Sequence, residues 1–529
     1  MRLESLDFLS PWLDLFPNQF PSPISVAVAI VFLISSWSFL SIARRGNAQT
    51  DLGSVPILGS RFYLRGCFDD SYVIVREGYQ KFSKQGKVWA VRISTGELMY
   101  ILPPCVLNEI KILPPSKASF MRVVNDSLKW SLHGDILSNI HIDVVRYSLN
   151  SNLAGMTSFL VREREAAFES ALGHITKDWK VIKVWEMVFK IMHSISIAVT
   201  FGEDFRKDSS YSNHVLSYLH TTPLLTFLYF ALPGPLRTPF WWLSPVGLKL
   251  RYHVRKVKSK LLPEIQRRAS LIQDTAAGTT TNTQKERKPS DFVFIDALLR
   301  RRPLPLTPSE ANRSADELMF MGFEQGPIAL IIIQLIYQVL SEPDCIEPLR
   351  AEVDEALVEG NGWTDDALNR MSKLDSFIRE TLRLRLPAPF TTTRRVLQPL
   401  QLSNGLKLRP GMLISSPSLG VNTDEEIYPD AERFDGYRFY DAATKTARPS
   451  AGTTTKDFLS FGAGNQVCPG RLLAVKVIKL VVGGLLHDFD LAFDNGRKER
   501  PRDVYSMWQI MPDRSASIVI RRRERAPAP

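Results

Sequence analysis

The chain has 529 residues and a formal net charge of +11 at pH 7; 44% of its residues are hydrophobic and 23% are charged. This composition is typical of a globular protein and excludes a wholly disordered chain. Four widely spaced cysteines (Cys67, Cys105, Cys345 and Cys468) argue against a disulfide framework and favour a reducing compartment.

The positive charge allows two interpretations. No compact basic run is interleaved with aromatic residues, so we expect no nucleic-acid partner. A solvated basic surface is the simpler interpretation, and attraction to anionic lipid or to an acidic protein is the functional one.

The N-terminal region contains an apolar run from Pro23 to Ala43 without a charge, which is about the length that a helix needs to cross a bilayer. Because Arg44 and Arg45 follow at once, the positive-inside rule places the rest of the chain in the cytoplasm. A cleaved signal peptide fits less well, since the run is long and ends in arginines rather than small residues. We predict a lumenal tail and transmembrane anchor over 1–45, a linker over 46–60 and one large domain over 61–529.

Helical patterns dominate this domain after a short hairpin predicted from Val88 to Ile93 and from Leu98 to Ile101. Apolar residues at helical spacing predict a helix over 142–153, which also carries Arg146. The stretch from Leu224 to Leu250 is rich in aromatic residues and prolines and stands beside a basic run. A bilayer contact and a buried helix–loop–helix remain equal alternatives for it.

A long helix is predicted from Ser314 to Leu340, with Ser314 and Glu317 as its capping box. Pro327 lacks an N–H group, so the pattern predicts a kink with a free carbonyl that can hold water. Glu324 is a candidate proton source, and the Gln325 amide can orient water. Alternatively, both are polar helix residues that are only solvated in a cavity.

Two further segments supply charged residues. Glu380 and Arg383 stand three residues apart on a predicted helix, so they can pair on one face. Short strands with a turn at Asn404-Gly405 follow, and Arg438 lies in the segment after them.

The glycine-rich loop from Phe461 to Arg471 presents Cys468 just before an apolar helix. Its glycines let the backbone approach a bulky object closely, and a helix N-terminus favours a thiolate. A metal ligand or a nucleophile is therefore predicted, with a buried core cysteine as the alternative.

The spacing of Phe461, Gly464, Cys468 and Gly470 resembles the haem-binding loop of the cytochrome P450 family. The resemblance implies that Cys468 is the axial thiolate ligand of the haem iron. Gln466 departs from the family pattern, which usually has Arg or His on a haem propionate at this place. The other cofactor-binding candidates that the resemblance implies are Arg146 and Arg395, or its neighbour Arg394.

The remaining motifs resemble the family in order and distance. Glu324 stands at the place of the family's acid, but Gln325 stands at the place of the alcohol that helps deliver protons. Glu380, Arg383 and Arg438 match the buried charged triad behind the haem, with a glycine in place of a proline before Arg438.

The resemblance implies a mainly α fold with small β-sheets, the cytochrome P450 fold, preceded by one transmembrane helix. It implies a haem-thiolate catalytic domain over 61–529 in the endoplasmic reticulum membrane, facing the cytoplasm. With haem b, dioxygen and NADPH electrons supplied by NADPH–cytochrome P450 reductase, it would oxidise a lipophilic small molecule. Similarity to fungal members indicates a terpenoid or related secondary metabolite.

Two alternatives to this reaction remain. Gln325 motivates a haem-thiolate enzyme that rearranges, dehydrates or closes a ring without ordinary oxygen insertion. A membrane haem protein that only binds or delivers a lipophile is the second.

Overall fold

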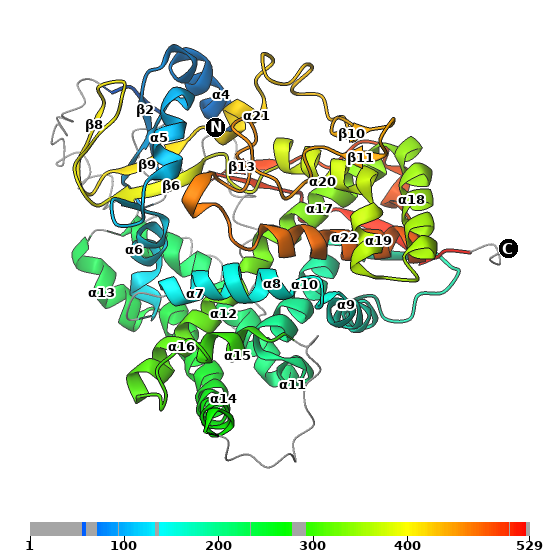
Figure 1. Cartoon of the computed structure of the whole chain (residues 1–529), viewed down its shortest axis with the longest axis horizontal. Helices are drawn as coiled ribbons and strands as arrows, with labels where there is room; N and C mark the ends of the chain where they lie inside the picture. The colour runs from blue at the N-terminus through cyan, green and yellow to red at the C-terminus, as the bar shows by residue number, and fades with distance from the viewer. Residues whose placement is uncertain are drawn as a thin grey trace.

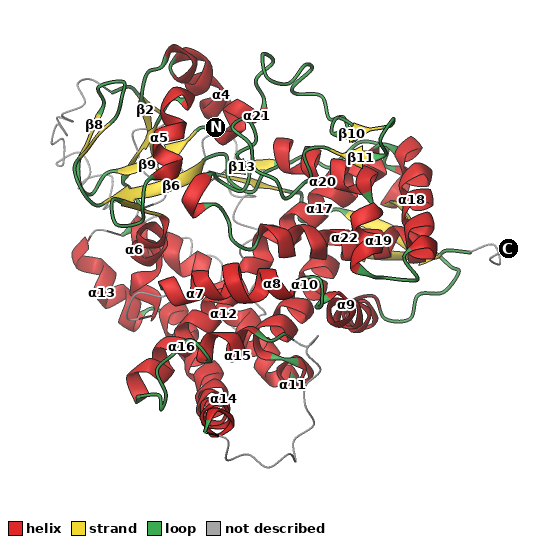
Figure 2. Cartoon of the chain, in the orientation of Figure 1, coloured by secondary structure: helices red, strands yellow, loops and turns green. Residues whose placement is uncertain are grey.

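The computed structural model describes residues 55–59, 71–93, 95–132, 137–232, 234–277, 292–506 and 508–524. These residues are mainly helical; the largest sheet lies at the left of the view in Figure 2, and smaller strand pairs such as β10 (Tyr440–Asp441) with β11 (Thr446–Ala447) lie at the right. The predicted fold class is therefore confirmed for the described residues. The predicted tail and anchor, and most of the predicted linker, lie outside them.

The largest sheet has six strands in the order β1-β2-β3-β9-β6-β4. They are β1 (Ile57–Leu58), β2 (Trp89–Arg92), β3 (Leu98–Ile101), β9 (Leu413–Ser416), β6 (Thr391–Val396) and β4 (Ala118–Ser119). The predicted hairpin is confirmed, because β2 and β3 are antiparallel with Trp89 opposite Ile101. β3 runs parallel to β9, and β6 pairs with both β9 and β4. The sheet thus brings the region after Glu380 beside the N-terminal part of the domain.

The helices form the rest of the molecule (Figure 1). The long ones are α9 (Thr157–Leu172), α10 (Val184–Phe201), α12 (Ser209–Ala231), α14 (Pro245–Ala276), α16 (Pro308–Met321), α17 (Gln325–Ser341), α18 (Ile346–Glu359), α20 (Ser372–Leu384) and α22 (Arg471–Asp488). The main core lies where α17 packs against α10, α20 and α22. By length and composition, α10 and the α16–α17 helix could each cross a membrane, but both are mostly buried within this fold.

Small sheets and hairpins complete the fold. β12 (Phe489–Phe493), β15 (Ser517–Arg522) and β5 (Lys180–Lys183) form one sheet, and β13 (Val504–Ser506) pairs with β14 (Gln509–Met511). The predicted turn at Asn404-Gly405 joins β7 (Leu400–Gln401) to β8 (Lys407–Leu408), and Gly405 has the positive φ of 83° that favours glycine there.

The start of the central helix was predicted wrongly. Its capping box is formed by Thr307 and Glu310, followed by Pro308 at the first helical position. Ser314 and Glu317 lie inside α16 and are fully buried, where Glu317 accepts from Arg302 instead of capping. The Ser/Thr-x-x-Glu pattern occurs twice here, and only the first copy is followed by a proline, which is preorganised for a helix start.

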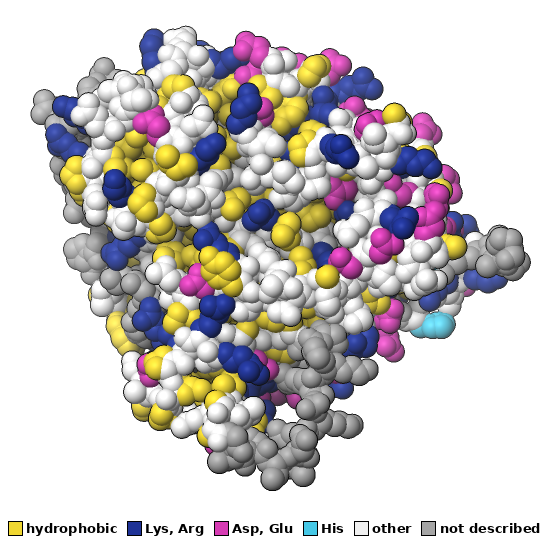
Figure 3. All heavy atoms as spheres, in the orientation of Figure 1, with side chains coloured by type: hydrophobic (Ala, Val, Ile, Leu, Met, Phe, Trp, Pro, Cys, Tyr) yellow, Lys and Arg dark blue, Asp and Glu magenta, His cyan; other side chains and the backbone are white. Residues whose placement is uncertain are grey.

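The stretch from Leu224 to Leu250 forms a helix–loop–helix through the end of α12, α13 (Gly234–Leu243) and the start of α14. Trp241 is buried, but Trp242, Leu243 and Leu248 are at least half exposed. The helix–loop–helix is therefore confirmed, and it packs inward on one side only; the bilayer contact stays a prediction for the side that presents apolar groups to solvent. Elsewhere on the visible face, acidic side chains gather over α18 and α19 (Asp365–Arg370), while Lys and Arg side chains are scattered (Figure 3).

Candidate active site

The cysteine loop lies between the large sheet and α22, in orange in Figure 1. Gly464 has φ of 69°, and a Cβ atom there would lie 1.9 Å from the Lys111 carbonyl oxygen, so only glycine fits. A single 3-10 turn, η6 (Gly464–Gln466), follows, and the Cys468 N–H then donates to the Phe461 carbonyl at 2.9 Å. These bonds fix the direction in which Cys468 points.

The Cys468 thiol is accessible but enclosed by protein atoms. It is exposed to solvent, yet surrounding protein desolvates it and raises its pKa to about 11, with the negative charge of Glu324 as the next cause. N–H groups of Gly470 and Arg471 at the start of α22 lower the pKa, but less than these two causes raise it. A raised pKa disfavours the free thiolate that a nucleophile needs, whereas a coordinated metal deprotonates a thiol outright. This favours the metal-ligand prediction for Cys468 over the nucleophile and over a buried core cysteine.

The central helix contains a local 3-10 turn, η4 (Gly322–Glu324), between α16 and α17. Glu324 is 42% exposed, and its charge reaches Cys468, so it lies on the side of the central helix that faces Cys468. This is the relation that the sequence predicts for an acid opposite the cysteine.

Gln325 takes a different place from the one predicted. It is buried, its Nε2 donates to the Gly322 carbonyl at 2.8 Å, and it lies beside His193 of α10. The side chain thus bonds back to the 3-10 turn η4 of its own helix. The structure does not bring Gln325 into the space between Glu324 and Cys468.

Gln466 holds the cysteine loop against a distant segment. Its Oε1 accepts from the Phe120 N–H at 2.9 Å, and its Nε2 donates to the Ala118 carbonyl at 2.8 Å. Asn465 adds a bond from its Nδ2 to the Ile112 carbonyl at 2.9 Å. The loop is therefore tied to the chain between α5 (Leu107–Ile112) and α6 (Phe120–Leu132). We name these four residues, Gln466, Asn465, Ala118 and Phe120, the loop clamp.

Of the two arginines on β6, Arg394 faces the loop. Arg394 is 2% exposed and its Nη2 lies 3.4 Å from the Gln466 carbonyl, while its Nε has no partner among the described residues. Burial lowers the pKa of Arg394 to about 10. Arg395 points to the other side of the strand, where it pairs with Glu97 at 3.0 Å and Asp126 at 3.5 Å.

Arg146 approaches the loop from a third direction. It lies on the π-helical turn η3 (Val144–Leu149), which follows α7 (Asn139–Asp143), and donates to the Asn465 carbonyl. Close by, Asn150 Nδ2 donates to the Pro469 carbonyl at 3.1 Å. The structure thus places Arg146 and Arg394, but not Arg395, at the cysteine loop.

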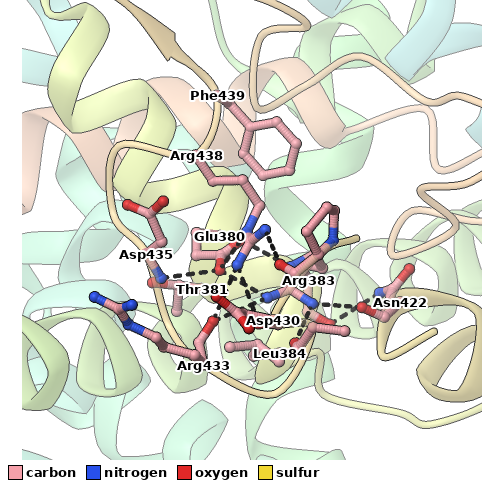
Figure 4. A network of polar contacts seen from close by, with 12 residues as sticks. Glu380, Thr381, Arg383, Leu384, Asn422, Asp430, Arg433, Asp435, Arg438 and Phe439 are labelled. Atoms are coloured by element: carbon pink, nitrogen blue, oxygen red, sulfur yellow. Dashed lines mark hydrogen bonds and ion pairs between the residues drawn. The ribbon is translucent and has the colours of Figure 1, made fainter. Parts of the chain in front are cut away.

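The predicted charged triad is brought together behind the loop (Figure 4). Arg383 makes two bonds of 2.7 Å to the Glu380 carboxylate, and Arg438 Nε adds a third at 3.1 Å. Arg383 also donates to the carbonyls of Asn422 and Ala431, so the triad orders the segment that leads to Arg438. A Cβ at Gly436 would lie 2.1 Å from the Phe377 ring, which explains why glycine stands there.

Comparison with known proteins agrees with this arrangement: a family model described as Cytochrome P450 matches residues 114–516. The chain belongs to the cytochrome P450 family. Cytochrome P450 monooxygenase verB of Clonostachys rogersoniana is 30% identical over 97% of this chain and 99% of the relative. Cytochrome P450 monooxygenase sirB of Leptosphaeria maculans is 34% identical, over 84% and 85% of the two chains. Bicoumarin synthase ktnC of Aspergillus niger is 31% identical, over 68% and 88%. This chain is accordingly a P450 monooxygenase rather than a passive haem carrier.

The residues at the site fit the haem that the P450 family implies. An accessible cysteine suits an iron ligand. Arg394 is a buried cation whose Nε has no partner among the described residues, so a carboxylate of the cofactor would satisfy it. Cys468 would hold the iron, and Arg394 with Arg146 would hold the propionates. Gln466 is already engaged in the loop clamp.

Sequence reasoning missed one P450 residue at this site. His141 of α7 is buried, and its Nε2 lies 3.7 Å from Glu324 Oε1. Its place one turn before Val145, directly ahead of the helix predicted over 142–153, was the available signal. That pattern could not reveal Glu324 as its neighbour, because the two residues lie far apart in the chain.

Proposed function

We propose that this P450 is a membrane-anchored monooxygenase that oxidises a lipophilic small molecule in a fungal secondary-metabolite pathway. Electrons come from NADPH through NADPH–cytochrome P450 reductase, and dioxygen is the oxidant. The observation that carries the proposal is the accessible Cys468 thiol opposite Glu324, beside the buried Arg394. Relatives with the name monooxygenase that match over nearly the whole chain support it.

Haem, when bound, supplies the oxygen activation, which an axial thiolate favours. The protein supplies position and charge. Cys468 would hold the iron, Arg394 and Arg146 would neutralise the propionates, and Glu324 would hold a proton on the side of the central helix that faces Cys468. The apolar core around α17 excludes water from the far side of that helix.

We also propose the predicted arrangement of anchor (1–45), linker (46–60) and haem-thiolate catalytic domain (61–529) in the endoplasmic reticulum membrane. The exposed Trp242, Leu243 and Leu248 support a second contact with the bilayer, because Arg251 lies among them with its guanidinium 4.9 Å from the Trp242 ring. Removal of residues 1–45 should weaken membrane binding. Mutation of Trp242, Leu243 and Leu248 to serine in this truncated protein should abolish the binding that remains. Sedimentation with vesicles measures both.

Oxidative ring formation or coupling is the second candidate. Two relatives, from Aspergillus niger and Aspergillus desertorum, bear the name bicoumarin synthase. Coupling removes one hydrogen from each of two substrate molecules and joins them, so no oxygen atom enters the product. The buried Gln325, which leaves no hydroxyl at the family's proton-relay place, favours this alternative. The terpenoid class remains a prediction without further support.

The reduced, carbon-monoxide-bound absorbance spectrum tests the core of the proposal. We expect a strongly red-shifted Soret band in the wild type and in Cys105→Ala, and its loss in Cys468→Ala. A band typical of a neutral ligand in the wild type would contradict a thiolate-ligated haem. Product analysis under labelled dioxygen then separates the two reactions, because only oxygen insertion places label in the product.

A further inference from the structure

His141 is a buried histidine that the proposed mechanism has not used. Its side chain is 4% exposed, and its Nε2 lies 3.7 Å from Glu324 Oε1. Its Nδ1 is buried and has no hydrogen-bond partner among the described residues. The rings of Phe294, on α15 (Phe294–Leu299), and Phe320, on α16, lie 5.3 and 6.0 Å away.

These surroundings are costly for an imidazole. A buried polar ring without partners is destabilising, and the aromatic walls from α15 and α16 offer it no hydrogen bond. Ser138, which caps α7, accepts at its Oγ from the backbone N–H of His141 at 3.4 Å. This bond does not involve the imidazole ring. Glu324 is the charged side chain that lies against it among the described residues. Packing against the two Phe rings buries His141, and Glu324 is the group that can compensate its polar ring.

Glu324 joins two regions. On one side it meets His141, and on the other its charge acts on Cys468. The next residue, Gln325, is bonded to the helix backbone and cannot pass on a proton as a hydroxyl would. Gln325 therefore does not return to Glu324 the protons that Glu324 gives up, and His141 is the titratable side chain described beside it.

We propose that His141 is a positioning and proton-donating partner of Glu324, and that the two form the proton route into the cavity above Cys468. The imidazolium gives its Nε2 proton to the Glu324 carboxylate and becomes neutral; the carboxylic acid then gives that proton to its acceptor in the cavity. A separation of 3.7 Å exceeds a direct hydrogen bond, so one water or a small rotation of the half-exposed Glu324 completes the step. The ring of His141 is 4% exposed, so water reprotonates its buried Nδ1 only when α7 opens locally. The inference rests on the proposed function, in which reduction of dioxygen consumes protons.

The test uses the full-length haem-loaded protein with its reductase, NADPH and dioxygen, without any organic substrate. His141→Phe keeps a ring of similar size between Phe294 and Phe320, Glu324→Gln removes the acid, and His174→Phe is the surface control. The rate of haem reduction under carbon monoxide reports folding and electron delivery. We expect this rate to be the same in all variants.

Under dioxygen, we expect NADPH oxidation to fall about 10-fold in His141→Phe and in Glu324→Gln, with a larger solvent isotope effect. The double variant should be no slower than Glu324→Gln alone, because both residues serve one route. His141→Gln keeps a polar side chain, but its amide cannot give up a proton, so it should be as slow as His141→Phe. Independently of turnover, the imidazole NMR signals of His141 should shift in Glu324→Gln and stay unchanged in Glu310→Gln.

A normal NADPH oxidation rate in His141→Phe, or effects that multiply in the double variant, would overturn the proton route and leave the proposed function standing. Wild-type protein that has no thiolate-type spectrum and consumes no NADPH would overturn the proposed function, and the route with it. A purely structural role for His141 would lower the thermal stability of His141→Phe without changing its solvent isotope effect. That result would also reject the route.

Discussion

Gly464 and Gly470 frame the cysteine but face different surroundings. Alanine at Gly464 would need a strained positive φ of 69° and would place its Cβ 1.9 Å from the Lys111 carbonyl. At Gly470 the φ is −85° and a Cβ would meet nothing within 4 Å. We expect Gly464→Ala to lose more than about 2 kcal/mol of unfolding free energy and most of its haem. Gly470→Ala should stay within about 0.5 kcal/mol of the wild type.

Denaturant unfolding and the haem-to-protein ratio measure this difference. Equal losses of unfolding free energy and of haem in the two variants would contradict this explanation, because only Gly464 lies against the Lys111 carbonyl.

At the residue scale, motif spacing alone identified Cys468 and the glycines around it. It left Arg394 and Arg395 undecided, because a strand turns neighbouring residues to opposite faces and the sequence does not say which face meets the loop. In the structure Arg395 pairs with Glu97 on the face of β6 that points away from the cysteine loop, so Arg394 is the arginine that meets the loop. The partners of Gln466 were equally hidden, since they are backbone groups of a segment far away in the chain.

The triad links α20 to the segment before the cysteine loop. Arg438→Ala would leave the fully buried Glu380 with one cation fewer and free the carbonyls of Pro429 and Asp430. Breaking one partner of such a buried network costs about 3–5 kcal/mol, so we expect a loss of that size in unfolding free energy.

Arg433→Ala is the matched control for Arg438→Ala. Arg433 contributes its backbone carbonyl to the network, and Figure 4 shows its side chain pointing away. Its loss should stay below about 0.5 kcal/mol, as for most surface substitutions. A similar cost for both variants would mean that removal of any nearby arginine, rather than the bond to Glu380, accounts for the effect.

The loop clamp couples two elements that the sequence keeps far apart. In Gln466→Ala the Phe120 N–H loses its acceptor, so its hydrogen exchange should become at least about 10-fold faster, a change that corresponds to roughly 1.4 kcal/mol of local opening. Gln466→Glu keeps an acceptor oxygen but loses the donor to Ala118. We expect it to retain the protection of Phe120, and equally fast exchange in both variants would contradict the clamp.

Element boundaries show why sequence reasoning stopped where it did. Most elements followed from periodicity and turn residues, including the β2–β3 hairpin, α20 and the turn after β7. The predicted N-cap of α16, Ser314, lies seven residues after the observed one, Thr307. Two copies of the same capping pattern occur in this stretch, and the burial of Glu317 in the fold distinguishes them. Local rules cannot contain that information.

Acid stability is a property of the whole molecule. Burial lowers the pKa of His193, and it lowers those of His220 and His253 to about 4 from the usual 6.5. The unfolded chain therefore binds protons near pH 6.5 that the folded chain binds only near pH 4. The free energy of unfolding should therefore fall as the pH drops from about 6.5 to about 4. Below about pH 4 these histidines should contribute little further change.

His253→Gln should reduce that acid sensitivity. His253 lies on α14, and its Nδ1 is 2.9 Å from Nδ1 of His214 on α12. A positive charge on both imidazoles at this distance would be repulsive. We expect a smaller fall of the melting temperature between pH 6.5 and pH 4.5 than in the wild type, measured by calorimetry. An identical fall in both proteins would assign the acid sensitivity to other groups.

At this largest scale, composition and helical periodicity predicted a mainly α domain, and the order of motifs predicted the family. The meeting of Glu324, His141 and Cys468 could not be predicted, because it depends on how α7, the central helix and the loop before α22 pack. Such contacts arise only from the packed fold.

The buried Arg394 has a consequence for how the protein is made. A guanidinium that is 2% exposed, with an unpaired Nε and a pKa lowered by burial, is an energetic burden on a newly synthesised chain. An incoming anionic cofactor relieves it, so cofactor binding and folding favour each other. In a host cell, the yield of soluble protein should therefore rise with the supply of haem precursor, and Arg394→Leu should remove much of that dependence.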